Sequence, residues 1–125
     1  MGAAVVAHGM GYAVEGREIL RGVDLAVRPG ELLSVVGISG GGKTSLLKCM
    51  AGLLRPTAGE IRIDGTDLAS LSEAALTEQR RRMGMVFQYA ALFDSLTVFD
   101  NVAFGLRYHR LAPPARIRQI VAERL

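Results

Sequence analysis

Gly37-Ile38-Ser39-Gly40-Gly41-Gly42-Lys43-Thr44 is the stretch of sequence that decides the fold. The near-continuous apolar run before it, from Glu31 to Gly37, predicts a short strand that is buried on both faces, as in a parallel sheet. The residues after it, from Lys43 to Leu54, repeat apolar side chains at helical spacing and predict an amphipathic helix. A strand, a glycine-rich loop and a helix that opens with Lys and Thr form the arrangement that phosphate binding requires. We call residues 37–44 the glycine-rich loop.

The residue types in the glycine-rich loop fit the chemistry of a nucleoside triphosphate. Its negative charges must be met by converging backbone N–H groups, and glycine reaches the backbone angles that convergence needs. The helix that follows adds its free N–H groups and the positive end of its dipole. We expect Lys43 to reach the β- and γ-phosphates and the hydroxyl of Thr44 to ligate Mg²⁺. The expected cofactors are therefore ATP and Mg²⁺, held by Gly37, Ser39, Gly40, Gly41, Gly42, Lys43, Thr44 and Ser45.

The rest of the chain alternates short strands with helices. Strands are predicted at residues 5–8, 12–14 and 19–27, where apolar and polar side chains alternate in the last of them. Another strand carries Ile61 and Ile63, and a short apolar strand at 85–87 precedes Gln88. Helices are predicted from Ser72 to about residue 82, from Thr97 onward, and after the two prolines at 113 and 114.

Composition and charge exclude several classes of protein. The chain has 125 residues, of which 50% are hydrophobic and 22% charged, as in a globular domain. No apolar run approaches the roughly 20 residues that span a bilayer, and no signal peptide is visible. The single cysteine, Cys49, excludes an internal disulfide and is expected to pack in the core. Five arginines follow residue 106, but we expect them to form a solvated helix face, and we expect no nucleic-acid partner.

Several segments in order resemble the first half of an ATP-binding cassette, the ATPase subunit of ABC transporters. Residues 23–31 (Val-Asp-Leu-Ala-Val-Arg-Pro-Gly-Glu) resemble the lead-in strand and turn, residues 52–61 the segment after the phosphate-binding helix, and residues 86–88 the Q-loop. The resemblance implies an α/β P-loop NTPase fold. Its N-terminal antiparallel β part would be followed by the start of a parallel core sheet and of a helical subdomain.

Two further site residues are implied by this resemblance. Tyr12 resembles the aromatic residue that stacks on the adenine, although stacking suits any flat base and does not fix ATP over GTP. Gln88 resembles the Q-loop glutamine, which contacts Mg²⁺ and the attacking water. The resemblance therefore implies that Lys43 and Gln88 are catalytic residues and that Thr44 and Gln88 bind Mg²⁺. Ile38 departs from the proline that is common at its position, which matters little if backbone N–H groups hold the phosphates.

A narrower resemblance follows Gln88. Residues 89–104 are similar to the ATPases of bacterial lipid-transport systems of the Mla and Mce types, which implies phospholipid transport. Importers of amino acids or metal ions share much of this pattern. The resemblance therefore does not decide whether the transported substrate is a phospholipid, an amino acid or a metal ion. The family implies a transmembrane permease as partner, a second ATP-binding subunit in a homodimer, and a cytoplasmic place at the inner face of the membrane. Leu92, Phe93, Val98 and Phe99 are expected either to dock on the permease or to pack in the core.

Three elements of the family are not found in residues 1–125: the signature motif, the Walker B strand with its acids, and the switch histidine. We therefore expect a partial ATP-binding domain over 1–125 whose glycine-rich loop holds ATP but has little means to hydrolyse it. We also expect the strand at 32–36 to lack a neighbour and to leave its faces partly bare. The alternatives are a nucleotide-binding half-module, which pairs with another subunit or acts without turnover, and an inert fragment.

Overall fold

The computed structural model describes residues 2–89 and 91–125, so Met1 and Ala90, the latter within the lipid-transport resemblance, lie outside the described residues. The chain divides into two compact units, Met1–Met85 and Val86–Leu125. The first unit carries the glycine-rich loop and Tyr12, and the second carries Gln88.

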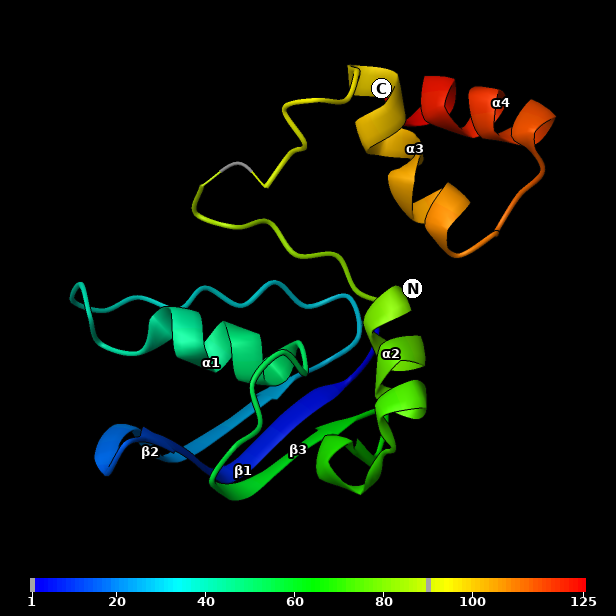
Figure 1. Cartoon of the computed structure of the whole chain (residues 1–125). Coiled ribbons are helices and arrows are strands. Elements are labelled where there is room, and N and C mark those ends of the chain that lie inside the picture. Colours follow the sequence, from blue (N-terminus) through cyan, green and yellow to red (C-terminus); the bar gives the residue numbers. More distant parts are fainter. Residues whose placement is uncertain (1, 90) are drawn as a thin grey trace. The chain divides into compact units, whose positions relative to one another are not determined.

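An antiparallel sheet forms the base of the first unit (Figure 1). Its strands are β1 (Val5–Val14), β2 (Arg17–Val27), β3 (Ala58–Ile63) and β4 (Thr66–Asp67), in the order β2-β1-β3-β4. The sequence predicted two strands at 5–8 and 12–14, whereas the structure joins them into β1, with register irregularities against β2 around Met10 to Ala13. The strand with Ile61 and Ile63 is confirmed as β3.

Two α-helices and a short 3₁₀ helix complete the first unit: α1 (Lys43–Met50), η1 (Leu68–Ser70) and α2 (Glu73–Arg81). Ser72 caps α2 as predicted, because its hydroxyl accepts from the N–H of Ala75 at 3.2 Å. Helix α1 ends earlier than the predicted residue 54. Gly52 has a φ of 71°, and the N–H groups of Gly52 and Leu53 return to the carbonyls of Cys49 and Lys48, a Schellman C-cap.

The core of the first unit lies between the sheet and its helices. Met10 of β1, Cys49 of α1 and Ile61 of β3 are each 2% exposed or less. Cys49 therefore packs as predicted, and burial raises the pKa of its thiol. Burial of Leu46 and Cys49 on one side of α1 packs this helix against the sheet, next to β1 and β2 (Figure 1).

The strand that was predicted immediately before the glycine-rich loop is not formed. Residues 31–37 have no strand conformation, and the side chains of Leu32 and Val36 are 93% and 90% exposed. The short strand predicted at 85–87 is also absent, and Val86 is 98% exposed. A strand needs a neighbour for its N–H and C=O groups, and among the described residues none pairs with either segment. The exposure of Leu32 and Val36 agrees with the expectation that this segment lacks a neighbour.

The second unit is a pair of packed helices, α3 (Val98–Tyr108) and α4 (Pro114–Arg124). Thr97 caps α3 as predicted, since its hydroxyl accepts from the N–H of Asp100 at 3.1 Å. Ala103, Ile117 and Val121 form the buried contact between the helices. In the described parts of the chain, no helix combines the length and the apolar character needed to cross a membrane.

The apolar residues after Gln88 divide between the two expected roles. Leu92, Phe93 and Val98 are exposed, while Phe99 packs against the helix core of the second unit. The ring of Phe93 lies 4.7 Å from that of Phe104, and Phe104 stacks on Tyr108 at 5.8 Å. An exposed apolar and aromatic surface therefore remains around the start of α3.

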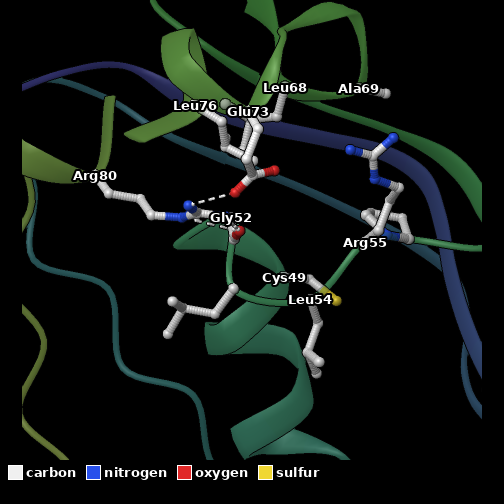
Figure 2. Close-up of a pocket in the computed structure, with 11 residues that line it drawn as sticks. Cys49, Gly52, Leu54, Arg55, Leu68, Ala69, Glu73, Leu76 and Arg80 are labelled. Carbon is white, nitrogen blue, oxygen red and sulfur yellow. Dashed lines mark hydrogen bonds and ion pairs between the residues drawn. The ribbon is translucent and has the colours of Figure 1, made fainter. Parts of the chain in front are cut away.

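Arg80 joins α2 to the C-terminal end of α1. Its guanidinium donates to the carbonyl of Gly52 at 2.8 and 3.2 Å and to the carboxylate of Glu73 at 2.9 Å (Figure 2). These groups line a pocket of about 280 Å³ whose wall includes Cys49 and Leu76. The neighbouring arginines make other pairs: Arg81 with Glu78 and Arg82 with Asp64.

Replacing Arg80 with alanine is expected to lower the free energy of unfolding by about 1–2 kcal/mol, because the carbonyl of Gly52 loses two donors at a partly buried site. Arg81→Ala is the matched control, since it removes only an ion pair with the exposed Glu78 and is expected to cost about 0.5 kcal/mol or less. Urea denaturation of the two variants checks the difference. Equal losses would show that the bond to Gly52 does not hold α1.

Candidate functional site

Backbone conformation shapes the glycine-rich loop. Gly40 and Gly42 have φ angles of 76° and 91°, in the region that residues with a Cβ rarely adopt. The N–H of Gly41 donates to the carbonyl of Ile38 at 3.1 Å and closes a tight turn. A Cβ on Gly42 would lie 2.9 Å from Leu20 Cδ2 and 3.2 Å from the carbonyl oxygen of Ile19. The glycine at position 42 therefore satisfies both a backbone requirement and a close contact with β2.

The N-terminus of α1 has no side-chain cap. Its N-cap is Gly42, which has no side chain to cap the helix, and no acidic residue lies in the first turn. The first N–H to find a partner in the helix is that of Leu46, which donates to the carbonyl of Gly42 at 2.9 Å. By helix geometry, the N–H groups of Lys43, Thr44 and Ser45 have no carbonyl within the helix, and the helix dipole is positive at this end.

Lys43 places its ammonium group across the glycine-rich loop. Nζ donates to the carbonyl oxygens of Gly37 at 2.8 Å and Ile38 at 2.5 Å. Both partners are neutral, and no ion pair between Lys43 and a carboxylate is found among the described residues. The ammonium of Lys43 therefore lies at the carbonyl of Ile38, which also accepts from the N–H of Gly41 in the loop.

Thr44 and Ser45 supply hydroxyl groups on the first turn of α1. Thr44 is exposed and Ser45 is half-buried. A hydroxyl is an oxygen ligand of the kind Mg²⁺ accepts, and Mg²⁺ commonly takes one or two protein ligands, with phosphate oxygens and waters as the others. The hydroxyls of Thr44 and Ser45 therefore fit as protein ligands for a Mg²⁺ ion that is bound together with phosphates. Within the described residues, no cluster of His, Cys, Asp or Glu could hold a metal ion by itself.

Tyr12 lies on β1 near the glycine-rich loop. It is half-buried and pairs across the sheet with Leu20 of β2, and Leu20 is the side chain that crowds Gly42. The structure thus brings Tyr12 together with the start of α1 through one intervening residue. A hollow of about 250 Å³ is lined by Tyr12, Leu20 and Thr57, among others.

Gln88 and Ile38 are both exposed. Gln88 belongs to the second unit, outside the unit that carries the loop. The side chain of Ile38 is 82% exposed, while its carbonyl accepts from both Gly41 and Lys43. The contacts of Ile38 within the loop are therefore made by its backbone carbonyl.

The sequence analysis did not identify the residues that contact Gly42 from β2 or those that hold β1 beside Tyr12. Ile19 and Leu20 were predicted only as part of a strand, and Thr57 only as part of the segment after the phosphate-binding helix. No local pattern identifies them, because their contacts with Gly42 and with Gly11 and Ala13 join positions far apart in the chain.

The chain is similar to ATP-binding proteins of transport systems. A family model described as "ABC transporter" matches residues 20–124. The intermembrane phospholipid transport system ATP-binding protein MlaF of Haemophilus influenzae is 48% identical over 109 residues, which are 87% of this chain and 41% of the relative. The methionine import ATP-binding protein MetN of Caulobacter vibrioides is 43% identical over 114 residues, 91% of this chain and 34% of the relative. The chain thus spans less than half of the length of these curated relatives.

A solved structure has the same fold. It is described as the dimeric structure of a post-hydrolysis state of an ATP-binding cassette bound to ADP and Pi, and it matches with a TM-score of 0.83 and 30% identity. The match covers 95% of this chain and 54% of that one. The α/β P-loop NTPase fold predicted from the sequence is confirmed, and the chain belongs to the ABC transporter family.

Proposed function

We propose that the glycine-rich loop binds the phosphates of Mg-ATP. Two observations carry the proposal: the N-terminus of α1 has three N–H groups without helical partners and no side-chain cap, and the ammonium of Lys43 lies at the carbonyls of the loop that precedes it. This arrangement supplies both the directed donors and the charge that a polyphosphate needs. Gly37, Ser39 and Gly40 to Gly42 contribute backbone donors and the turn that aims them.

The side chains have separate roles in this proposal. When nucleotide binds, Lys43 exchanges its hydrogen bonds to the carbonyls of Gly37 and Ile38 for hydrogen bonds to the β- and γ-phosphates. The negatively charged phosphate oxygens satisfy its charge better than the neutral carbonyls do. Thr44 supplies a hydroxyl ligand for Mg²⁺, which when bound neutralises phosphate charge. Tyr12 stacks on the base, and Gln88 acts with the metal and the attacking water.

Replacing Thr44 with valine tests the metal assignment. Valine keeps the shape of the side chain but has no hydroxyl, so the affinity for Mg-ATP should fall about tenfold, to the affinity measured for ATP in EDTA. Thr44→Ser keeps the hydroxyl and is expected to bind as the parent chain does. Isothermal titration of the three chains checks this. If Mg²⁺ raised the ATP affinity of the valine variant as much as that of the parent chain, Thr44 would not be a ligand of the metal.

We place this site in the ATP-binding subunit of an ABC transporter, which uses ATP hydrolysis to energise transport. The partners would be a transmembrane permease and a second ATP-binding subunit, at the cytoplasmic face of the membrane. The exposed surface formed by Leu92, Phe93 and Val98 supports contact with a permease. The dimer described for the related cassette structure supports the second subunit.

Phospholipid is the transported substrate that the sequence favours. The support is the similarity to MlaF, described as part of an intermembrane phospholipid transport system, together with the pattern of residues 89–104. Methionine is the competing substrate, because MetN is similar over 91% of the chain. In a purified transporter that contains this chain, ATP hydrolysis stimulated by phospholipid and not by methionine would support the assignment, and the reverse would overturn it.

A second candidate is nucleotide binding without turnover. It is favoured by the exposure of residues 31–37, a segment that has no neighbouring strand among the described residues. Phosphate release measured on the 125-residue chain separates the two functions. If the isolated chain binds Mg-ATP but releases no phosphate, the result supports nucleotide binding without turnover. Release of phosphate would support ATP hydrolysis.

A further inference from the structure

Thr57 makes hydrogen bonds on both sides of Tyr12. Its backbone N–H donates to the carbonyl of Gly11 at 2.9 Å. Its hydroxyl accepts from the N–H of Ala13 at 3.0 Å and donates to the carbonyl of Gly11 at 3.5 Å. One residue from the segment after α1 therefore fixes the two peptide groups that flank Tyr12 in β1.

The backbone of β1 needs such support at this point. Its register against β2 shifts between Met10 and Tyr12 and again between Tyr12 and Ala13. Its pairing with β3 has its last rung at Gly11, opposite Ala58. Beyond that rung the hydroxyl of Thr57 takes the place of a strand carbonyl for the N–H of Ala13. In an irregular strand the direction of a side chain depends on how the local peptides are held.

We propose that Thr57 is a positioning residue that sets the orientation of Tyr12 for stacking on the base. This inference rests on the proposed binding of a nucleotide and adds a residue that neither the motifs nor the family comparisons identify. Thr57 acts on the base end of the site alone, because it touches the backbone beside Tyr12, whereas the ammonium of Lys43 lies at the loop.

The test compares a ligand that has a base with one that has none. Thr57→Val, which removes the hydroxyl at nearly constant volume, should weaken Mg-ATP binding about three- to tenfold. Binding of Mg-tripolyphosphate, which lacks a base, should not change. Thr57→Ser keeps the hydroxyl and should retain most of the affinity for Mg-ATP. Isothermal titration of both ligands with the 125-residue chain gives all of these values.

Two outcomes would overturn the inference: an unchanged affinity of Thr57→Val for Mg-ATP, or equal losses for both ligands, which a general loss of structure would produce.

Tyr12→Ala and Lys43→Ala separate this failure from failure of the proposed function. Tyr12→Ala should weaken the binding of Mg-ATP but not that of Mg-tripolyphosphate. In the double variant, Thr57→Val should cause little further loss of Mg-ATP affinity beyond that of Tyr12→Ala. If Tyr12→Ala has no effect, base stacking fails and the role of Thr57 fails with it. If Lys43→Ala binds both ligands normally, the phosphate site itself is wrong.

Discussion

Replacing Lys43 with alanine is expected to weaken the binding of Mg-ATP by about 30- to 100-fold. The ammonium of Lys43 is held over the glycine-rich loop by two neutral carbonyls, so it is available to phosphate oxygens. Hydrogen bonds to charged groups contribute about 1.5–3 kcal/mol each, which converts to an effect of this size. Equilibrium titration of the variant with Mg-ATP measures it.

Lys48→Ala is the matched control for this experiment. Lys48 lies on the same helix, in its last turn, at the end away from the free N–H groups. Its removal changes the net charge of the chain by the same amount, but it should leave the affinity for Mg-ATP within about twofold. A similar loss in both variants would mean that the chain attracts nucleotide through its general positive charge. No loss in either would mean that the loop does not bind phosphate.

Replacing Gly42 with alanine is expected to lower the free energy of unfolding by about 2–5 kcal/mol. A φ of 91° is unfavourable for a residue with a Cβ, which costs about 1–2 kcal/mol. The added methyl group would also meet Leu20 at 2.9 Å and the carbonyl of Ile19 at 3.2 Å, and such crowding costs about 1–3 kcal/mol. Because Gly42 is the N-cap of α1, relief of this contact would displace the anion-binding end of the helix, so Mg-ATP binding should weaken as well.

Gly40→Ala separates the two causes. Its φ of 76° imposes a similar backbone penalty, but a Cβ at this position would meet nothing within 4 Å. It should therefore lose only about 1–2 kcal/mol. Chemical denaturation of both variants gives the comparison, and equal losses would show that the contact of Gly42 with β2 is unimportant.

Elements that depend on neighbours in the sequence could be predicted well. Ser72 and Thr97 cap α2 and α3 because their hydroxyls bond N–H groups three residues ahead. The loop from residue 37 to 44 followed from its glycines and from Lys43, because its geometry is set by backbone angles and by the start of one helix. The alternating side chains at 19–27 predicted a strand there, which the structure shows as part of β2.

Elements that depend on distant partners could not be predicted in the same way. The apolar run at 31–37 has the composition of a buried strand, but a strand also needs a neighbour, and composition does not supply one. The end of α1 at Met50 was missed for a different reason, because the predicted helix ran past Gly52, a local C-cap residue whose carbonyl is also held by Arg80 from α2. The support of Tyr12 by Thr57 joins residues more than forty positions apart, as the bond from Ala13 to Thr57 shows.

Amide NMR of the chain during titration with Mg-ATP tests the central claim most directly, because it reports on each backbone N–H separately. We expect the largest shifts at the amides of Gly40 through Ser45, with saturation at the same ligand concentration, and their loss in Lys43→Ala. Unchanged resonances for these amides, while others shift or none do, would contradict the assignment of the glycine-rich loop and the first turn of α1 as the phosphate site.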